Sequence, residues 1–409
     1  MYSKIFIKRN KVDNRIILFE VTKKCNLSCT YCINNDFYNR SKVYEDINLK
    51  FIKAKKLIDH LVKIWNSDKN SSLNEEIRIG FYGGEPLLNF ELIEKIVNYS
   101  KSIKLRFNSF RFNMTTNGTL LDKHMDFLVK NDFNIMISLD GNKECNLYRT
   151  FKNGKKSFKS VNKNLKKLEK KYPEFFKNNV IFNAVLHNNN SVESIYNYFK
   201  NEFNKKPRIS EIDRTGIREC KTECFNFIYN NIEESIELAS DKSEIEREMI
   251  FYSPRGYRLI KHLYYNSELF FKSHSSLQNI NTKKKPTGSC IPLQKKIFLD
   301  CEGNIFPCER VGKEHKMGRV TVKSVEIWYE KIAEKYNRYF NVLKNQCSKC
   351  YNINTCPNCI LKMEPAKEGF KCKYWIGKEQ YEKRFKQILD FLRENRDLYR
   401  KIAEEIFLE

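Results

Sequence analysis

The sequence lacks a long apolar run. No stretch approaches the roughly 20 consecutive apolar residues that a membrane-spanning helix needs, and no apolar segment at the start resembles a signal peptide. We therefore expect a cytoplasmic protein without a membrane partner. The 409 residues, 41% hydrophobic and 13% aromatic, suffice for one large core and a second, smaller one. This composition predicts a globular chain of two or three domains.

Acidic residues are in deficit, because the chain has 50 Asp and Glu against 75 Lys and Arg, a formal net charge of +25. Basic potential attracts anionic partners. The lysines are spread along helical faces, as in residues 162–171, and do not form one tail. This spread favours an acidic peptide over nucleic acid as a partner, although AT-biased coding explains the composition equally well. We expect no nucleic-acid binding.

A fourth cysteine is missing from the stretch "CNLSCTYC", which holds Cys25, Cys29 and Cys32. Clustered cysteines in a reducing cytosol hold metal or act in catalysis more often than they form disulfides. Four-iron clusters normally take four thiolates, so three thiolates leave one iron open to a ligand from outside the protein. The alternative is a zinc site or three unrelated thiols. A structural zinc ion prefers four ligands, and no His with ligand spacing lies nearby.

From residue 16 to about 215, short β-rich apolar runs alternate with longer stretches of helical periodicity. This order predicts a parallel sheet with right-handed crossovers, and hence an α/β fold, a partial (β/α)6 TIM-like barrel. In such barrels the chemistry gathers at the carboxyl ends of the strands. The predicted strands cover residues 16–22, 77–83, 110–117, 135–141, 180–187 and 209–215, and the predicted helices cover residues 51–65, 90–103, 120–130, 157–172 and 191–203.

This pattern predicts that the chain is divided into four parts. Residues 1–219 form the predicted barrel, and residues 220–289 form a helical bridging segment that ends in the linker-like loop 281–288. Residues 290–378 contain eight of the fourteen cysteines and form a predicted cysteine-rich iron-sulfur domain. Residues 379–409 form a predicted amphipathic C-terminal helix.

The cysteine loop and the motifs at the strand ends resemble the radical SAM superfamily, in which CxxxCxxC holds a [4Fe-4S] cluster and S-adenosylmethionine (SAM) chelates the open iron. The resemblance implies that Tyr31 contacts adenine and that the "GGEP" motif, residues 83–86, meets the methionine amino group. An acidic acceptor suits an ammonium group, which favours Glu85. Ser138 and Arg149 match residues that meet the methionine carboxylate and neighbouring polar groups. The implied cofactor contacts are Tyr31, Gly83, Gly84, Glu85, Pro86, Asn117, Ser138, Asp140 and Arg149.

Each of these motifs has a structural alternative. GGEP is also a common strand-to-loop turn, and Arg149 is also a plausible solvated loop arginine. Asn117 and Asp140 precede glycines, and Asn-Gly and Asp-Gly steps form turns readily.

The C-terminal cysteines, with Gly303, resemble the SPASM-type domain, which holds two auxiliary [4Fe-4S] clusters. The resemblance implies three clusters in the whole chain. The last cysteine pair departs from the family, because two residues separate it where three are usual. The rival interpretation is a zinc knuckle over residues 347–359, which leaves three cysteines unexplained. The implied ligands are Cys290, Cys308 and Cys359 for the first auxiliary cluster and Cys347, Cys350, Cys356 and Cys372 for the second.

With three cysteines, the first auxiliary cluster also has an open iron, unless Cys301 supplies a fourth ligand. Cys301 lies beside a Glu-Gly turn that we expect to join two strands. A side chain at a turn tip tends to point outward. The sequence therefore slightly favours the open iron, which would bind the thiolate of a substrate cysteine.

The resemblance implies a radical SAM oxidoreductase that abstracts a hydrogen from a peptide or protein side chain with a 5′-deoxyadenosyl radical. The favoured reading is a peptide maturase that forms a thioether or other cross-link in a ribosomally made, Cys-rich peptide (a RiPP). The alternative is an anaerobic sulfatase-maturing enzyme that makes formylglycine, in whose relatives an acid at the position of Glu309 takes a substrate proton. Glu309 is otherwise a surface ion-pair residue. A binding protein without chemistry is the non-enzyme alternative, which the intact cysteine motif and Glu85 disfavour.

The implied partners are a precursor peptide or protein and a reductant such as flavodoxin or ferredoxin. The chain begins 24 residues before Cys25. Many peptide maturases carry a leader-binding domain of several dozen residues there. We therefore expect leader recognition to use another surface or a separate leader-binding protein.

Overall fold

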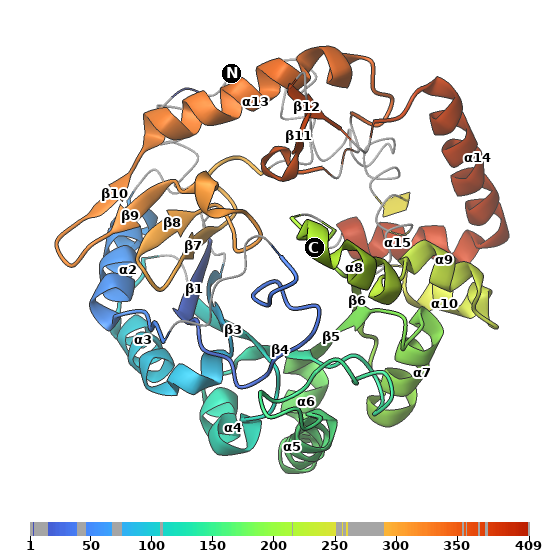
Figure 1. Ribbon diagram of the computed structural model, residues 1–409. Helices are drawn as coiled ribbons and strands as arrows, with labels where there is room; N and C mark the ends of the chain where they lie inside the picture. The colour runs from blue at the N-terminus through green and yellow to red at the C-terminus, as the bar shows by residue number, and fades with distance from the viewer. Residues whose placement is uncertain are drawn as a thin grey trace. The chain divides into compact units, whose positions relative to one another are not determined.

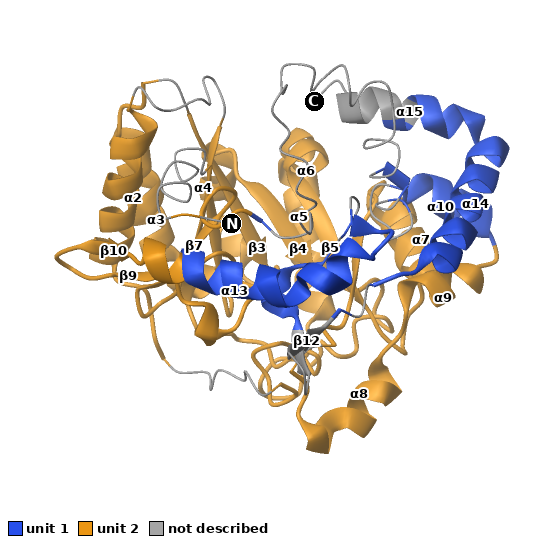
Figure 2. Ribbon diagram, turned by 90° about the horizontal axis from the view of Figure 1, so that it is seen from above, with its two compact units in different colours: residues 1–2, 241–290, 333–409 blue, residues 3–240, 291–332 orange. Residues whose placement is uncertain are grey.

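The computed structural model describes most of the chain, in two compact units (Figure 2). The barrel unit comprises residues 3–240 and 291–332, and the C-terminal unit comprises residues 1–2, 241–290 and 333–409. The residues described are 3, 15–38, 46–67, 76–106, 109–214, 216–250, 256, 259–260, 290–353, 356, 358–366, 369–372 and 375–407.

The barrel unit is built on a ten-stranded sheet in the order β10-β9-β8-β7-β1-β2-β3-β4-β5-β6. Strands β1 to β6 are parallel, and helices pack along the outside of this part of the sheet (Figure 1). The parallel strands are β1 (Ile16–Thr22), β2 (Ile77–Gly83), β3 (Phe110–Thr116), β4 (Asn134–Ser138), β5 (Val180–Leu186) and β6 (Arg208–Glu211). The helices between them are α2 (Phe51–Trp65), η2 (Pro86–Asn89), α3 (Phe90–Ser102), α4 (Leu121–Lys130), α5 (Phe158–Lys171), α6 (Pro173–Asn179) and α7 (Val192–Phe203).

Local sequence accounts for these elements. Strand β1 reads as a nearly continuous apolar run, and six of its seven residues are buried, as expected for a parallel strand covered on both faces. Helix α2 buries Ala54, Leu57, Ile58, Leu61 and Trp65, whose spacing of three and four residues forms one apolar stripe. These patterns place the barrel core between the sheet and the outer helices.

The sheet is extended beyond β1 by four short strands, of which the first, β7, pairs with β1 in parallel. The others continue antiparallel. Among the described residues β1 does not pair with β6, so the α/β barrel is partial, as predicted. These strands lie in the barrel unit, although the sequence groups them with the predicted cysteine-rich domain. They are β7 (Ile297–Leu299), β8 (Asn304–Phe306), β9 (Gly318–Val320) and β10 (Val325–Ile327).

Short helices follow β6, which agrees with the helical bridging segment as far as the described residues extend. They are η3 (Glu219–Lys221), α8 (Thr222–Ile228), α9 (Ile232–Glu237) and α10 (Lys242–Glu248). The predicted linker loop 281–288 lies outside the described residues. The remaining elements are η4 (Lys313–His315), α13 (Tyr329–Ser348), η6 (Ile360–Lys362), β11 (Glu364–Ala366), β12 (Gly369–Lys371), α14 (Lys378–Glu394) and α15 (Arg396–Phe407). The domain boundaries themselves stay predictions.

The prediction of one C-terminal helix over residues 379–409 is wrong. Two helices, α14 and α15, meet at Asn395, whose backbone leaves the helical region at φ −126° and ψ 60°. The Asn395 side chain donates to the carbonyl of Phe391 at 2.9 Å and caps the end of α14. The break lets Phe391 of α14 and Leu398 of α15 pack in the same apolar cluster. In the part of the chain that the structure describes, no helix has the length and apolarity to span a bilayer.

Candidate active site

The three cysteines of the CxxxCxxC motif lie in the loop that leaves the carboxyl end of β1. The loop turns where the Cys32 amide donates to the Cys29 carbonyl at 3.1 Å. Burial raises the pKa of Cys29 to about 12, and the charges of Cys32 and Cys25 add to the rise against the opposing effect of Arg149. Burial likewise raises the pKa of Cys25 to about 12. The mutual charge effects show that the three sulfur atoms lie near one another.

A second loop pairs with the cysteine loop. The Ser28 amide donates to the Thr150 carbonyl at 2.7 Å, and the Thr30 amide donates to the Tyr148 carbonyl at 3.2 Å. An isolated antiparallel bridge joins Leu27 to the residue after Thr150. The backbone of residues 148–152 therefore braces the cysteine loop.

The GGEP motif lies against the backbone that leads into the cysteine loop. The Gly84 amide donates to the Thr22 carbonyl at 2.9 Å, and the Glu85 amide donates to the Lys24 carbonyl at 2.7 Å. A Cβ atom on Gly84 would overlap the Lys24 carbonyl oxygen, so this approach requires glycine. GGEP is therefore more than a turn, because it fixes the start of the cysteine loop. Its other members are Gly83, with φ 151°, and Pro86, which begins η2.

Glu85 is fully buried, and hydrogen bonds hold both of its carboxylate oxygens. One oxygen accepts from the Thr116 hydroxyl at 2.6 Å and the Leu87 amide at 3.1 Å, and the other accepts from the Asn117 amide at 2.7 Å. Burial raises the pKa of Glu85 to about 7, in spite of these bonds. The carboxylate thus ties the end of β2 to the end of β3, and its contact with a methionine amino group stays a prediction.

Asn117 follows β3 and faces the cysteine loop. The nitrogen of its side-chain amide donates to the Asn26 side chain at 2.9 Å and lies 3.9 Å from the Cys25 sulfur atom. The oxygen of its side-chain amide accepts from the Thr119 hydroxyl at 2.7 Å. Asn117 therefore lies next to the predicted cluster ligands, and it also closes a local turn. The structure is compatible with a cofactor contact and with a turn residue.

Asp140 is the centre of a buried polar network. Its carboxylate accepts from the Arg149 guanidinium and the Val185 amide, both at 2.9 Å, and from the hydroxyl of Tyr31 in the cysteine loop. His187 Nε2 lies 3.7 Å away. Burial alone would raise the pKa of Asp140, but the charge of Arg149 and the hydrogen bonds hold it at about 2. Asp140 is therefore an ionised link between the cysteine loop and the ends of β4 and β5.

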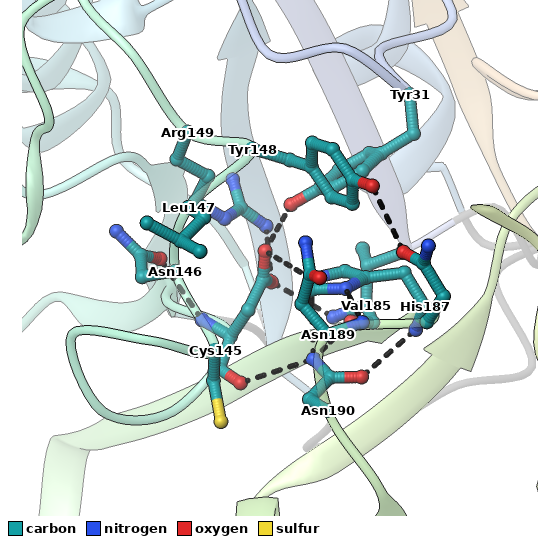
Figure 3. Close-up of polar contacts among 12 residues, drawn as sticks. Tyr31, Cys145, Asn146, Leu147, Tyr148, Arg149, Val185, His187, Asn189 and Asn190 are labelled. Carbon is teal, nitrogen blue, oxygen red and sulfur yellow. Dashed lines mark hydrogen bonds and ion pairs between the residues drawn. The ribbon is translucent and has the colours of Figure 1, made fainter.

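Tyr31 lies among aromatic and cationic groups in this network (Figure 3). Its ring stacks on His187 at a centroid distance of 5.8 Å and an interplanar angle of 25°. The Tyr148 ring meets it edge-on at 6.4 Å, and the Arg149 Cζ atom lies 5.4 Å from its centroid. The adenine contact of Tyr31 stays a prediction, but its hydroxyl is already engaged by Asp140.

Arg149 is buried, so the solvated-loop interpretation is wrong. One guanidinium nitrogen pairs with Asp140, while the buried Nε atom has no hydrogen-bond partner among the described residues. Ser138, at the end of β4, is half-buried and no hydrogen bond of its hydroxyl is found in the described part of the chain. Unpartnered buried polar atoms of this kind are unusual and fit a site that receives a polar ligand.

Glu309 lines a cavity of about 320 Å³ in the barrel unit. The cavity is also lined by Ile33 and Asn34, the two residues after the third cysteine of the loop, and by Tyr82 of β2. The Glu309 carboxylate lies 3.0 Å from the Lys296 ammonium group and is 14% exposed. Burial raises the pKa of Tyr82, and the charges of Cys32 and Glu309 add to the rise. Glu309 is thus both an ion-pair residue and a neighbour of the cysteine loop.

The expectation that Cys301 points outward is wrong. The turn between β7 and β8 exists as predicted, but Cys301 is 3% exposed. Its sulfur atom donates to the Glu20 carbonyl at 3.0 Å, and its amide donates to the Glu20 carboxylate at 3.2 Å. The cause is the pairing of β7 with β1, which places this turn beside a second strand instead of in solvent.

The C-terminal unit brings two groups of cysteines together. Burial raises the pKa of Cys347 to about 11, and the charges of Cys372, Cys356 and Cys350 add to the rise. Burial also raises the pKa of Cys359, and here the contributing thiolate is Cys290. The groups coincide with the two predicted auxiliary ligand sets, except that Cys308 belongs to the barrel unit. The ligand assignments stay predictions.

The donor chemistry of these sites fits iron-sulfur clusters. Thiols that share one loop, such as Cys25, Cys29 and Cys32, are the ligands such clusters take. Among the described residues no three Cys, His, Asp or Glu side chains converge closely enough to hold a metal ion as they stand. Binding a cluster requires these thiols to lose their protons.

Residues 19–200 match the family model of the radical SAM superfamily. The chain therefore contains a radical SAM domain. Over 142 residues it is 37% identical to the uncharacterized protein MJ0907 of Methanocaldococcus jannaschii, covering 34% of this chain and 44% of that protein. Over 363 residues it is 23% identical to a cysteine-type anaerobic sulfatase-maturating enzyme of Clostridium novyi, covering 84% and 86%. The chain thus spans less than half of the first relative and most of the second.

Solved structures share the fold of this chain. The structure of anSMEcpe with bound AdoMet and the Cp18Cys peptide has a TM-score of 0.62 at 18% identity, covering 95% of this chain and 99% of that chain. SuiB of Streptococcus suis with S-adenosylmethionine has a TM-score of 0.55 at 16% identity, covering 90% and 79%. SuiB with its precursor peptide SuiA has a TM-score of 0.50 at 15% identity, covering 86% and 73%.

Sequence reasoning missed several polar residues of the radical SAM domain and its surroundings. His187 and Asn190 follow β5 and surround Asp140, and Tyr82 and Lys296 accompany Glu309. His187 ends a predicted strand in a parallel sheet, so the rule that strand ends carry chemistry contained a signal for it. A local signal also existed for Lys296, because the hairpin of β7 and β8, whose turn the sequence predicts, places it opposite Glu309.

We expect Gly84→Ala to destabilise the radical SAM domain by about 3 kcal/mol, because overpacking against backbone forces strain that side-chain movement does not relieve. The overlap with the Lys24 carbonyl would also displace the cysteine loop. Urea unfolding measures the change. Gly377→Ala is the control, since only Trp375 ring atoms, the nearest at 3.5 Å, lie close to its added Cβ. Equal stability of the two variants would contradict the close packing of GGEP.

Proposed function

We propose that this enzyme is a peptide or protein maturase that oxidises a cysteine-containing substrate in the cavity beside the cysteine loop. The observation that carries the proposal is Glu309, a half-enclosed carboxylate in a cavity that shares Ile33 and Asn34 with that loop. A volume of 320 Å³ is large enough for a side chain and its flanking backbone. The similarity to a sulfatase-maturating enzyme over most of the chain supports a protein or peptide substrate.

The proposed cofactors are SAM and three [4Fe-4S] clusters, held by Cys25, Cys29 and Cys32 and by the two C-terminal cysteine sets. When bound, these groups supply the radical that removes a substrate hydrogen and the acceptor for the remaining electron. Arg149 Nε and Ser138 offer polar atoms without partners in the described residues, and we assign them to the methionine end of SAM.

The residues of the chain have distinct roles in this proposal. Glu309 takes the proton that the substrate loses after hydrogen abstraction, and Lys296, at 3.0 Å, holds the carboxylate in place. Tyr82 lies between Glu309 and the cysteine loop and forms part of the cavity wall. The buried network of Asp140 fixes Tyr31, and with it the loop that carries the cluster ligands.

The primary proposal for the product is a thioether or other cross-link in a ribosomally made, Cys-rich peptide. The second candidate is formylglycine in a sulfatase, and the position of Glu309 after Cys308 favours it specifically. Mass spectrometry of the substrate separates them. A cross-link removes two hydrogen atoms, whereas formylglycine from cysteine replaces the thiol group by an aldehyde oxygen.

The function is tested with Glu309→Gln. Because a positioned base contributes about a hundredfold or more, the rate of peptide modification should fall by that factor while SAM cleavage continues. The measurement is modified peptide formed per 5′-deoxyadenosine released, from dithionite-reduced enzyme. Glu326→Gln is the control, since Glu326 also forms an ion pair, with Arg319 at 2.8 Å, but on an exposed hairpin. An unchanged yield in Glu309→Gln would remove this residue from the mechanism.

A further inference from the structure

A strongly basic segment follows the strand that ends at Ser138. Between Glu144 and Glu169 the chain contains no Asp or Glu but has one arginine and seven lysines. The arginine, Arg149, is buried in the network of Asp140, so it adds no charge to the surface. The exposed lysines of this segment, together with Lys170 just after Glu169, form what we call the α5 lysine surface: Lys152, Lys155, Lys156, Lys159, Lys163, Lys167 and Lys170.

The α5 lysine surface follows from helical spacing. Lys159, Lys163 and Lys167 are four residues apart, so they form one row along α5, on the outside of the sheet (Figure 1). The opposite face of α5 buries apolar side chains such as Leu165 and Leu168. The row is therefore a fixed feature of a packed helix, not a loose tail.

Of these lysines, Lys167 interacts with the charge of Asp126. Glu169 pairs with Lys166, and Asp126 pairs with Lys171, neither of which belongs to the surface. No ion pair of Lys155, Lys159, Lys163 or Lys170 is found among the residues that the structure describes. Several cations in a row without counter-charges create a positive potential that attracts an acidic partner.

This surface is continuous with the loop that carries the cluster ligands. The Lys152 amide donates to the Asn26 carbonyl at 3.4 Å, and the adjacent Phe151 bridges to Leu27. Paired strands lie about 5 Å apart. The backbone at Lys152 is therefore about that far from the backbone of the cysteine loop. A partner on the α5 lysine surface would be held next to that loop.

We propose that the α5 lysine surface is the docking site for a small acidic electron-transfer protein of the flavodoxin or ferredoxin type. The inference rests on the proposed function, because SAM cleavage consumes an electron that the chain does not itself provide. The partner donates one electron, is oxidised by it, and dissociates. The positive charge of the surface fits an acidic partner. Its continuity with the cysteine loop fits a partner that delivers an electron to that loop. An acidic substrate peptide on the same lysines is the competing outcome of the test.

The test compares two ways of reducing the enzyme. The variant Lys155→Glu, Lys159→Glu and Lys163→Glu should keep its rate of 5′-deoxyadenosine release with dithionite within about twofold, because a small reductant needs no docking. With chemically reduced flavodoxin, its KM for flavodoxin should rise about tenfold or more at low salt. The difference from wild type should shrink at high salt, because ions screen exposed charges.

The control variant carries Lys378→Glu, Lys383→Glu and Lys386→Glu on α14, which gives the same change in net charge from exposed helix positions. An equal rise in KM for flavodoxin in the control would overturn the assigned location, as would no rise in the α5 variant. A rise in KM for the substrate peptide under dithionite would assign the surface to the substrate instead and overturn the proposal. Failure of the wild type to release 5′-deoxyadenosine with dithionite would overturn the proposed function, and this inference with it.

Discussion

Replacing Cys25, Cys29 and Cys32 together by Ala is expected to abolish SAM cleavage and to lower the iron content by about four atoms per chain, the content of one cubane cluster. The three thiols share one loop after β1, and Glu85, Asn117 and residues 148–152 hold that loop from outside. The other seven predicted ligands all lie after residue 289, in other segments of the chain. Their iron should therefore remain.

Iron analysis and release of 5′-deoxyadenosine measure this result. The matched control is Cys220→Ala with Cys224→Ala, two exposed cysteines of the barrel unit that belong to no predicted cluster. The control should keep all of its iron and its activity. Loss of nearly all iron in the triple variant would show that the cysteine loop and the C-terminal cysteines do not bind iron independently.

Asp140→Asn is expected to destabilise the protein by about 3 to 5 kcal/mol, the usual effect of leaving one member of a buried ion pair without its partner. Asp140 is fully buried, and its loss of charge leaves the Arg149 guanidinium uncompensated at 8% exposure. The variant also weakens the hydrogen bond that holds Tyr31 in the cysteine loop. Cluster assembly should therefore fall along with the free energy of unfolding.

The control for this prediction is Asp126→Asn, because Asp126 pairs with Lys171 at 2.7 Å but with 67% of its side chain exposed. Exposed pairs contribute about 0 to 1 kcal/mol, so this variant should unfold nearly as the wild type does. Urea unfolding at neutral pH compares the two. If Asp140→Asn lost no more stability than Asp126→Asn, the network would not anchor the cysteine loop.

The bounds of a barrel strand or helix could be predicted where the spacing of apolar residues within that segment is clear. Strand β1, helix α2 and strand β2 have the predicted bounds, because their apolar spacing is unambiguous and turn residues flank them. The last strand, predicted over residues 209–215, ends at Glu211. It is short and less apolar, so its pattern defines its end poorly.

The features that were missed depend on long-range contacts. The pairing of β7 with β1 joins residues far apart in the sequence, and no local pattern encodes it. That pairing buries Cys301 beside the Glu20 carbonyl. The break at Asn395 has the same origin, because both helices pack in one cluster with Ile250 and Leu259. Cysteine spacing, by contrast, is local, and the charges of Cys350, Cys356 and Cys372 do affect Cys347, although the ligand assignment stays a prediction.

The central claim is that the cysteine loop and its buried supports form a site for reductive cleavage of SAM. The most direct test is to reconstitute the full chain with iron and sulfide, reduce it with dithionite, and quantify 5′-deoxyadenosine after adding SAM. We expect 5′-deoxyadenosine together with an equal amount of methionine, and neither product from the triple cysteine variant. A wild-type protein with its full iron content that released no 5′-deoxyadenosine would contradict the account.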